Sequence, residues 1–448
     1  MRRPLIVKYL FHPVGQGLFA SGHLEICHPN GKSSSFSWVY DCGTTSSQKF
    51  IDAGLAHLSQ TIGGPRPAID LVIISHFDID HISGIVKLLG IFPVRTLIIP
   101  LTPLWQRLSV LFDSTQYVEK SIIPFYLDPV AAISGINGAR IEKIVLIPPS
   151  EGEGPPVQRS MDNDAPFPPG AGGDDINGDE GARIALTLPP GASEFAGDNE
   201  SSGTYANTKV YKIAPGESLS CVGLFEFVPY NDACLINPRS AAFVAAASAN
   251  SKALLGATSN YLRNDALRAL KRQYEAEFKD SYERNAISLY IYAGPIRKGA
   301  AILSARHRRY EAGFEYKYDF PMRWCRGASH WEAVLKSAHT EHNIGANILY
   351  TGDGFLKTPD SWNRLASYLG LTRTVPLLVF QVMHHGSSAN WRKTLARDVG
   401  ARIAIFSSDP DHRRFKHPHD SVVDDFASCG EVAMVNKTVG FAFICAVV

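Results

Sequence analysis

Four residues of types that bind metal ions stand close together near position 80 of this 448-residue chain. His76, Asp78, Asp80 and His81 fall within six residues, shortly after the apolar run Leu71–Ile74. A loop can direct successive side chains at one point, whereas a regular helix or strand cannot. Imidazole and carboxylate ligands together suit Zn²⁺, Mn²⁺ or iron. The segment predicts a metal site, and the alternative is a solvated polar turn.

Two further motifs follow apolar runs of strand length. Asp353 follows Asn347–Tyr350, where a carboxylate at a strand end can bridge two metal ions, although Gly-Asp is also a common turn. His384 and His385 follow Leu377–Val382. One of them suits a metal ligand and the other a proton-transfer group, and the sequence leaves open which is which. A core histidine is the alternative here.

The fourth motif is the loop His412–His419, which follows the apolar run Arg402–Phe406. It mixes basic, aromatic and imidazole side chains. Such groups can hold a phosphate through charge-assisted hydrogen bonds and protonate a leaving group. A solvated basic loop is the alternative. The candidates in this loop are Arg413, Arg414, Lys416 and His417.

Strand and helix patterns alternate along the chain, which is typical of a layered α/β protein. We expect further strands at Leu5–Phe11, Leu24–Cys27, Phe36–Tyr40, Thr96–Ile99, Leu224–Val228 and Ile287–Tyr292. We expect helices at Ser47–Leu58, Ile82–Leu89, Trp362–Tyr368 and Asn390–Asp398, and a mostly helical stretch at Ser240–Tyr282 that breaks near Gly256.

The net charge of +1 is the sum of two oppositely charged parts. Residues 151–200 hold 11 Asp and Glu but only 2 Arg, a charge of −9, and 16 of these 50 residues are Gly or Pro. This composition predicts a flexible acidic segment. The remaining chain holds 42 Lys and Arg against 32 Asp and Glu, a charge of +10. Net charge therefore does not exclude a phosphate-bearing partner.

Composition excludes several classes of protein. With 45% hydrophobic and 19% charged residues, the chain is not wholly disordered, collagen-like or a coiled coil. The 7 cysteines form no Cys-x-x-Cys pair, so we expect reduced thiols and a cytoplasmic protein. Lys8 and Tyr9 interrupt the only apolar run near the N-terminus, and no run reaches about 18 apolar residues. We therefore expect neither a signal peptide nor a membrane span.

The order of these motifs resembles the metallo-β-lactamase fold superfamily, whose signature is His-x-His-x-Asp-His. Within that superfamily, the motifs look like those of the soluble hydrolase domain of ComEC competence proteins. Phe11–Gly17 is similar to its Val-Gly-Gln-Gly opening, and Val39–Gly43 to its strand ending in Asp-x-Gly. Asn285–Leu289 and the Thr-Gly-Asp, His-His-Gly-Ser and His-Pro-His motifs follow in the same order. Two positions depart from the pattern, namely Asp78 at the second histidine and Leu18 in place of an acid.

The resemblance implies an αββα sandwich in a single hydrolase domain, 1–448, with a large insertion at about 101–284 that includes the acidic segment 151–200. It implies two divalent metal ions, Zn²⁺ or Mn²⁺, and a metal-activated hydroxide as the nucleophile. The implied metal ligands are His76, Asp78, Asp80, His81, Asp353 and His384. The implied catalytic residues are Asp80, His385, Lys416 and His417, with Asp41 and Ser387 supporting the ligands and Arg413 and Arg414 binding substrate.

We therefore expect a phosphodiesterase, and more specifically a nuclease. Basic and aromatic residues interleave at Arg306–Tyr310 and Arg323–Arg326, a mixture that suits single-stranded nucleic acid, although a solvated face is the alternative. Two other functions stay open. The insertion can narrow the site for a small phosphoester, or the chain can be a non-catalytic binding module that retains the fold. The oligomeric state also stays open.

Overall fold

The computed structural model describes residues 5–27, 33–64, 67–111, 123–150, 152–156, 183–195, 208–235, 240–255, 260–277, 288–296, 302–311 and 346–447. Most of the predicted flexible acidic segment, Asn285–Ile287 and Arg323–Arg326 lie outside the described residues.

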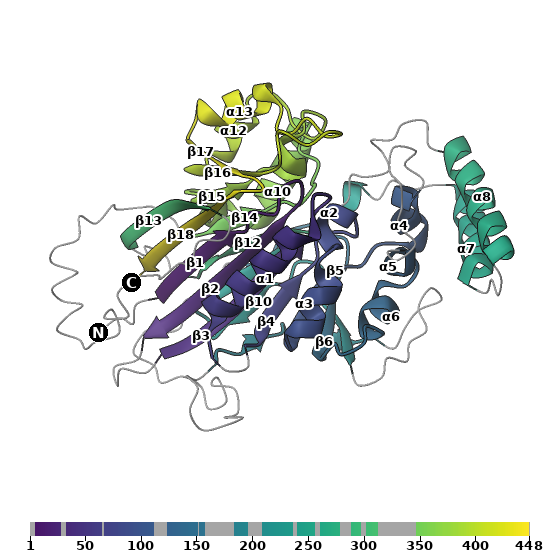
Figure 1. Ribbon diagram of the computed structural model, residues 1–448, viewed down its shortest axis with the longest axis horizontal. Helices are drawn as coiled ribbons and strands as arrows, with labels where there is room; N and C mark the ends of the chain where they lie inside the picture. Colours follow the sequence, from purple (N-terminus) through teal and green to yellow (C-terminus); the bar gives the residue numbers. More distant parts are fainter. Residues whose placement is uncertain are drawn as a thin grey trace.

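Two β-sheets packed face to face form the centre of the molecule (Figure 1). The first sheet contains, in spatial order, β13 (Ile302–Glu311), β18 (Val439–Val447), β1 (Leu5–Phe11), β2 (Phe19–Cys27), β3 (Ser33–Cys42), β4 (Ile69–Ile73), β5 (Val94–Pro100), β6 (Ile141–Ile147), β9 (Lys209–Lys212) and β8 (Ser193–Glu194). The second contains β17 (Glu431–Val435), β16 (Ile403–Ser407), β15 (Val379–Gln381), β14 (Ile348–Tyr350), β12 (Tyr290–Pro295), β11 (Phe225–Tyr230), β10 (Leu219–Cys221) and β7 (Leu186–Thr187).

Each sheet has a parallel half that carries the chemical motifs. Strands β3 to β6 are parallel to one another, with Trp38 opposite Leu71, and β14 to β17 are parallel in the second sheet. Parallel strands of this kind are buried on both faces, which explains their continuous apolar sequences. Because their carboxyl ends lie at one edge of each sheet, the loops that follow them can meet.

Large aromatic side chains fill the space between the two sheets. Trp38 of β3 packs against Phe225 and Phe227 of β11, with ring centroids 5.6 and 5.4 Å apart, and Tyr40 stacks on Tyr350 at 4.6 Å. All five side chains are fully buried. Burial of rings of this size is a major source of stability. The inter-sheet core therefore fixes β3 against β11 and β14, and with them the loops at the strand ends.

Helices cover the outer face of each sheet, so the expected αββα sandwich is confirmed. The first sheet is covered by α1 (Gln48–Ile62), α3 (Ile85–Ile91), α4 (Leu104–Leu111), α5 (Ile123–Leu127), α6 (Pro129–Ser134), α7 (Ala241–Leu255) and α8 (Asn260–Glu277). The second is covered by α10 (Pro359–Leu369), α12 (Leu395–Val399) and α13 (Asp420–Ala427). Figure 1 shows α7 and α8 as a helical pair at the far end of the first sheet.

Local sequence signals account for several helix ends. Thr358 caps α10 by accepting a hydrogen bond from Ser361 N, Pro359 occupies the first turn, and the helix stops at Gly370 with a φ of 77°. Asp128 caps α6 in the same way, by accepting from Ala131 N. None of the described helices combines the length and apolar character that crossing a bilayer requires.

The structure differs from the sequence prediction at two helices. Within the range 101–284, β6, β9, β10 and β11 pair within the two sheets. The predicted helix Ile82–Leu89 is divided into α2 (Ile79–Ile82) and α3, with Gly84 between them packed tightly on Cys42. The predicted helix Asn390–Asp398 was wrong in its first half, because α12 begins only at Leu395.

Candidate metal centre

The His-rich segment His76–His81 runs from the loop after β4 into α2, which contains Asp80 and His81, and two close backbone contacts support it. Leu18 N donates to Asp80 O at 3.0 Å, and Gly84 N donates to Cys42 O at 2.8 Å. A Cβ on Gly17 would lie 2.8 Å from Asp80 O, and one on Gly43 would overlap the backbone of Asp80 and His81. The glycines of the two flanking motifs therefore allow the loop to approach. Leu18, which replaces the acid of the family pattern, is a buried core residue.

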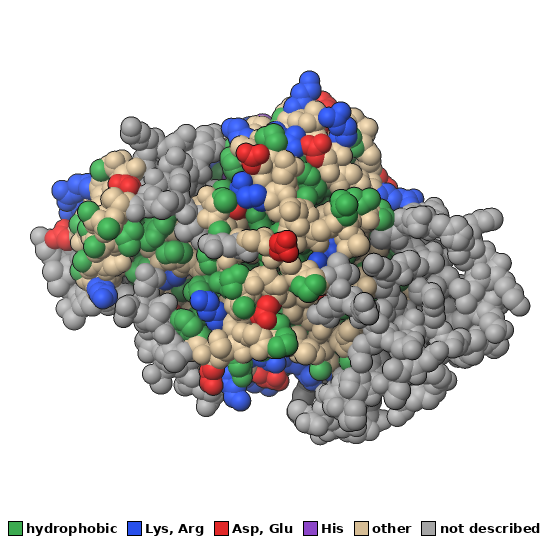
Figure 2. Space-filling model, turned by 180° about the vertical axis from the view of Figure 1, so that it is seen from behind, with side chains coloured by type: hydrophobic (Ala, Val, Ile, Leu, Met, Phe, Trp, Pro, Cys, Tyr) green, Lys and Arg blue, Asp and Glu red, His purple; other side chains and the backbone are tan. Residues whose placement is uncertain are grey.

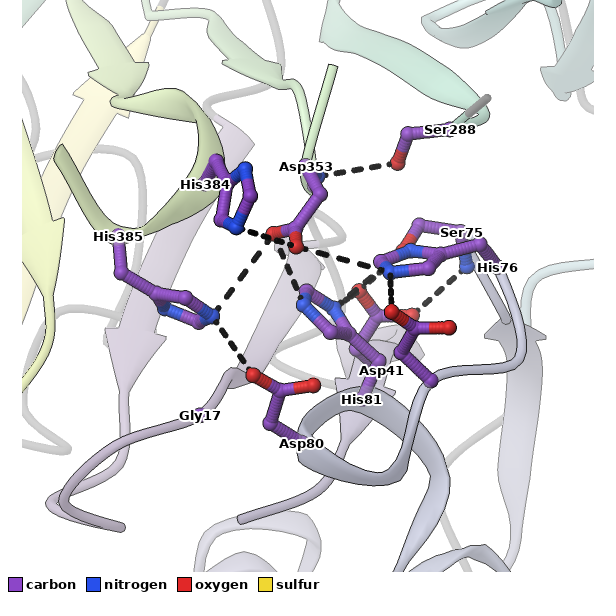
Figure 3. A network of polar contacts seen from close by, with 12 residues as sticks. Gly17, Asp41, Ser75, His76, Asp80, His81, Ser288, Asp353, His384 and His385 are labelled. Atoms are coloured by element: carbon purple, nitrogen blue, oxygen red, sulfur yellow. Dashed lines mark hydrogen bonds and ion pairs between the residues drawn. The ribbon is translucent and has the colours of Figure 1, made fainter. Parts of the chain in front are cut away.

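Asp353 lies at the centre of the site, between two pairs of histidines (Figure 3). Its Oδ2 atom is 3.7 Å from His76 Nε2 and 3.6 Å from His384 Nε2. Its Oδ1 atom is 3.0 Å from His81 Nε2 and 3.7 Å from His385 Nε2. The residue follows β14, so the Gly-Asp motif delivers the carboxylate from the second sheet into the loop of the first.

Each of the four imidazoles presents its Nε2 atom to this centre because its Nδ1 atom is bonded elsewhere. His81 Nδ1 is 2.8 Å from Asp41 Oδ2, and His385 Nδ1 is 2.6 Å from Ser407 O. The remaining two Nδ1 contacts are His76 to Ser75 Oγ at 2.9 Å and His384 to Asn390 Oδ1 at 2.9 Å. A neutral imidazole bonded in this way carries its proton on Nδ1 and has a lone pair on Nε2, as metal-binding histidines do.

The other contacts of Asn390 show that its side-chain oxygen is the atom that accepts from His384 Nδ1. The Asn390 amide nitrogen donates to Asp353 O at 2.8 Å and to Gly354 O at 3.2 Å, so its oxygen faces His384. For His76, the Ser75 hydroxyl donates to Asp41 Oδ2 at 2.6 Å and is thus left to accept. Both relationships direct the lone pair of Nε2 toward Asp353.

These residues fit divalent metal ions. Apart from the 3.0 Å contact between His81 Nε2 and Asp353 Oδ1, the buried atoms His76 Nε2, His81 Nε2 and Asp353 Oδ1 have no hydrogen-bond partner within the part of the chain that the structure describes. Two groups have ligand atoms close enough to hold one ion each, namely His76, His81 and Asp353, and Asp80, His81 and His385. Buried polar atoms normally have partners. A group of imidazoles and carboxylates whose buried atoms lack such partners suits Zn²⁺, Mn²⁺ or iron.

The electrostatics of the cluster favour a cation. Burial alone would lower the pKa of His81, but Asp353 and Asp41 raise it well above its ordinary value. Burial would also raise the pKa of Asp353, yet His384, His81 and His385 hold it well below its usual range. The pKa of His76 falls to about 4, mainly through burial and then through His81. The Asp353 carboxylate therefore stays ionised beside a neutral His76 near pH 7.

Asp41 lies under the site as expected from its place at the end of β3. It accepts hydrogen bonds from Ser75 N at 2.7 Å and, as above, contacts His81. Its φ of 56° is unusual for a residue other than glycine, a type of strain found at functional sites. Asp41 thus joins the loop to the first sheet and sets the orientation of His81.

The two adjacent histidines reach opposite oxygens of Asp353. His384 and His385 both have left-handed backbone angles, with φ of 46° and 55°, within the 3-10 turn η4 (Met383–Gly386). The His385 side chain is 3% exposed and its Nε2 also lies 3.2 Å from Asp80 Oδ2, whereas the His384 side chain is 28% exposed. The geometry thus puts both imidazoles at the centre and gives His385 the more enclosed place. Ser387 shapes this turn, since its backbone N donates to His384 O at 2.8 Å.

Asp78 lies on the His76 side of the centre. Its Oδ2 atom is 3.8 Å from His76 Nε2, and its Oδ1 atom accepts a 3.1 Å hydrogen bond from the hydroxyl of Tyr126. Asp78 and Tyr126 are both buried. Burial, and then Asp78, raise the pKa of Tyr126 well above its ordinary value, so the phenol keeps its proton and acts as the donor.

The basic loop after β16 lies next to His384. The ring of His417 is 5.8 Å from that of His384, and it is nearly parallel to the ring of Phe415 at 6.2 Å. Burial first, and then His385, lower the pKa of His417 to about 3, so it is neutral near pH 7. The other predicted phosphate-binding side chains of this loop are exposed, namely Arg413, Arg414 and Lys416.

Sequence reasoning missed five residues that contact the centre, and one of them, Ser75, stands directly before His76. Tyr126 belongs to a range without a recognised motif, and Ser407 contributes only its backbone carbonyl to His385. Asn390 stands close after the His-His-Gly motif, a signal that was available. Ser288, whose hydroxyl accepts from Asp353 N at 3.1 Å, lies in the Asn-x-Ser-Leu segment, which was recognised as a strand but not as part of the site.

Comparison with known proteins supports the metal-centre interpretation. The family model of the metallo-beta-lactamase superfamily matches residues 36–187. The matched range contains Asp41 and the whole His-rich loop. No curated protein matches the chain. Members of this superfamily are generally metal-dependent hydrolases, and the two sheets with outer helices agree with that fold carrying additional segments.

Proposed function

We propose that this protein is a metal-dependent phosphodiesterase that cleaves nucleic acid. The observation that carries the proposal is the position of Asp353, whose two carboxylate oxygens face different pairs of histidines. A shared carboxylate between two ligand groups is the arrangement that a two-ion centre needs. Such centres recur in phosphatases and nucleases, where the ions contact both the attacking and the leaving oxygen.

The chain's own residues divide into two ligand groups around Asp353. On one side we place His76, Asp78 and His384, and on the other Asp80, His81 and His385. His81 is also close enough to contribute to the first group. Two divalent ions, Zn²⁺ or Mn²⁺, would supply activation of water and neutralisation of phosphate charge when bound. Asp41, Ser75, Asn390 and the Ser407 carbonyl orient the imidazoles, so the site is assembled before substrate arrives.

The basic loop supplies the substrate contacts in this proposal. Arg413, Arg414 and Lys416 are exposed beside the centre and suit charge-assisted hydrogen bonds to phosphate oxygens. Within this loop, the ring of His417 lies next to that of His384. A phosphate beside His417 would raise its low pKa, because a nearby negative charge favours the imidazolium form. His417 could then donate a proton to the leaving oxygen.

Surface charge is consistent with this local mode of binding. Figure 2 shows Lys and Arg side chains interspersed with Asp and Glu over the described part of one face, without a large area of a single sign there. Arg306–Tyr310 lies in β13, which pairs with β18 at the edge of the first sheet. We therefore assign phosphate recognition to the loop His412–His419 in preference to a broad basic surface.

The test is a substrate panel with purified protein and Mn²⁺ or Zn²⁺. Single- and double-stranded DNA and RNA are incubated with wild-type protein and with His81→Ala, together with a chromogenic phosphodiester. The proposal predicts cleavage of at least one nucleic acid by the wild type and a loss of at least 100-fold in His81→Ala. Wild-type protein that binds metal but leaves every nucleic acid intact would refute nuclease activity.

A second candidate function is hydrolysis of a small phosphoester. The observation that favours it is the contact of Tyr126 with Asp78, because it brings α5 of the predicted insertion to the side of the centre. A segment at that place can narrow the space for a polymer. Turnover of the chromogenic phosphodiester without nucleic-acid cleavage in the same panel would select this function.

A further inference from the structure

We propose that Tyr126 is a positioning residue that orients the carboxylate of Asp78 for metal binding. The inference rests on the proposed metal centre and deepens it, because it assigns part of the centre's support to a segment without any metal-ligating motif. The two residues are far apart in sequence, and the hydrogen bond from Tyr126 Oη to Asp78 Oδ1 is 3.1 Å long.

The carboxylate of Asp78 is not used by the helix that it precedes. Asp78 occupies the N-cap position of α2, where Asp commonly accepts a backbone hydrogen bond, but its side chain makes no such cap contact. Instead, Oδ1 accepts from Tyr126 and Oδ2 is directed to the His76 side of the centre, 3.8 Å from Nε2. The side chain is 2% exposed, so water does not replace these contacts.

The backbone of Tyr126 is held in place by a buried arginine. Arg107 Nε donates to Tyr126 O at 2.8 Å and Nη2 donates to Leu127 O at 3.1 Å, and Nη1 donates to Thr102 O just after β5. Arg107 is 8% exposed. Its guanidinium thus fixes the last carbonyls of α5 to the end of a central strand. The ring of Tyr126 also packs edge-on against Phe77, with centroids 6.5 Å apart.

This chain of contacts restricts how Asp78 can rotate. A neutral donor on Oδ1 fixes the plane of the carboxylate and keeps Oδ2 directed to the His76 side of the centre. Hydrogen-bond partners of this kind orient metal ligands, and their removal typically weakens metal binding by about 10- to 100-fold. We infer that α5 tunes the affinity for the ion on the His76 side of Asp353.

The test compares Mn²⁺ binding of full-length variants by isothermal titration calorimetry. Tyr126→Phe removes only the hydroxyl and keeps the ring that packs on Phe77. Tyr274→Phe is the matched control, because Tyr274 is also a buried tyrosine of the range 101–284, but its hydroxyl donates to the backbone oxygen of Trp105. Melting temperatures of both variants show whether each is folded.

We expect Tyr126→Phe to weaken Mn²⁺ binding by about 10- to 100-fold, while Tyr274→Phe binds like the wild type. In an Asp78→Asn background, Tyr126→Phe should have little further effect, since both changes act on one ligand. Unchanged Mn²⁺ binding in Tyr126→Phe overturns the inference but not the proposed metal centre. The same holds if Tyr126→Phe weakens binding equally in the wild type and in the Asp78→Asn background. A wild-type protein that binds no Mn²⁺ overturns both the inference and the proposed function.

Discussion

Asp41 and His81 are joined by a 2.8 Å hydrogen bond between Asp41 Oδ2 and His81 Nδ1, and both side chains are fully buried. Asp41 comes from the end of β3 and His81 from α2, so the bond connects the first sheet with the His-rich loop. It leaves His81 Nε2 facing Asp353 at 3.0 Å. The orientation of a candidate ligand is thus set from beneath the site.

We predict that Asp41→Asn weakens divalent metal binding by about 10- to 100-fold, because an amide cannot reproduce all the acceptor contacts that Asp41 makes to Ser75 and His81. Mn²⁺ titration of the purified variant measures this. Asp52→Asn, which removes the same charge at a side chain that is 57% exposed, is the control and should bind like the wild type. Equal affinities of all three proteins would contradict the role of Asp41.

Gly17→Ala should destabilise the fold and impair the centre. The new Cβ would lie 2.6 Å from Thr44 Cα and 2.8 Å from Asp80 O, so the loop must move. Overpacking of this kind costs about 1–3 kcal/mol. Gly63→Ala also has a positive φ, 71°, but its Cβ meets nothing within 4 Å. Urea unfolding should show a larger loss for Gly17→Ala than for Gly63→Ala, and equal losses would argue against the close approach.

Stability should fall in mild acid partly because of His23. Burial, followed by Lys8 and Arg183, lowers its pKa to about 3 in the folded protein, whereas an unfolded histidine has a pKa near 6.5. Between these values the unfolded chain binds a proton that the folded chain does not. Stability due to neutral His23 is therefore present above pH 6.5 and is lost as the pH falls toward 3.

His23→Gln should reduce this acid sensitivity by up to about 1.4 kcal/mol per pH unit. The measurement is the free energy of unfolding in urea at several pH values from 7 to 4.5, compared between variant and wild type. Because each protein is compared with itself across pH, a constant offset from the substitution does not affect the result. Parallel pH dependences would show that His23 is not buried in its neutral form.

Arg373→Met should be strongly destabilising, because it removes the cation of a buried ion pair. Arg373 Nε is 2.7 Å from Glu226 Oε1, both side chains are 2% exposed, and the guanidinium also donates to Pro155 O and Leu369 O. Leaving Glu226 buried without its partner costs about 3–5 kcal/mol.

The matched comparison for this ion pair is Arg364→Met. Arg364 bonds Asp232 at 2.8 Å, but its side chain is 36% exposed, so water can partly replace it. Chemical denaturation should give a clearly larger loss for Arg373→Met than for Arg364→Met. A similar loss in both variants would contradict the difference in burial.

The layered fold and the positions of the main motifs were predictable because each motif directly follows an apolar run. β1 spans Leu5–Phe11 as predicted, and the loops after β4, β14, β15 and β16 carry the residues that meet at the centre. The carboxyl ends of parallel strands lie at one edge of a sheet. A His or Asp that directly follows a predicted strand can therefore be expected near the others of its kind.

The sequence did not predict contacts made by segments without a motif. Strands β6 to β11 have short apolar runs that do not reveal which sheet they join. Tyr126 contacts Asp78 from α5, whose last carbonyls accept from Arg107, and Ser407 contributes a carbonyl that any residue has. The segment before α12 is not helical because Asn390 turns its side chain toward Asp353 and His384. Each of these features depends on distant parts of the chain.

The central claim is that Asp353 is shared between two metal ions, and the most direct test is the number of ions bound per chain. Elemental analysis and Mn²⁺ titration of the wild type should give two ions, and Asp353→Asn should weaken binding of both because each group loses a carboxylate oxygen. A wild type that binds at most one ion, or an Asp353→Asn variant that retains two ions with unchanged affinity, would contradict the shared site.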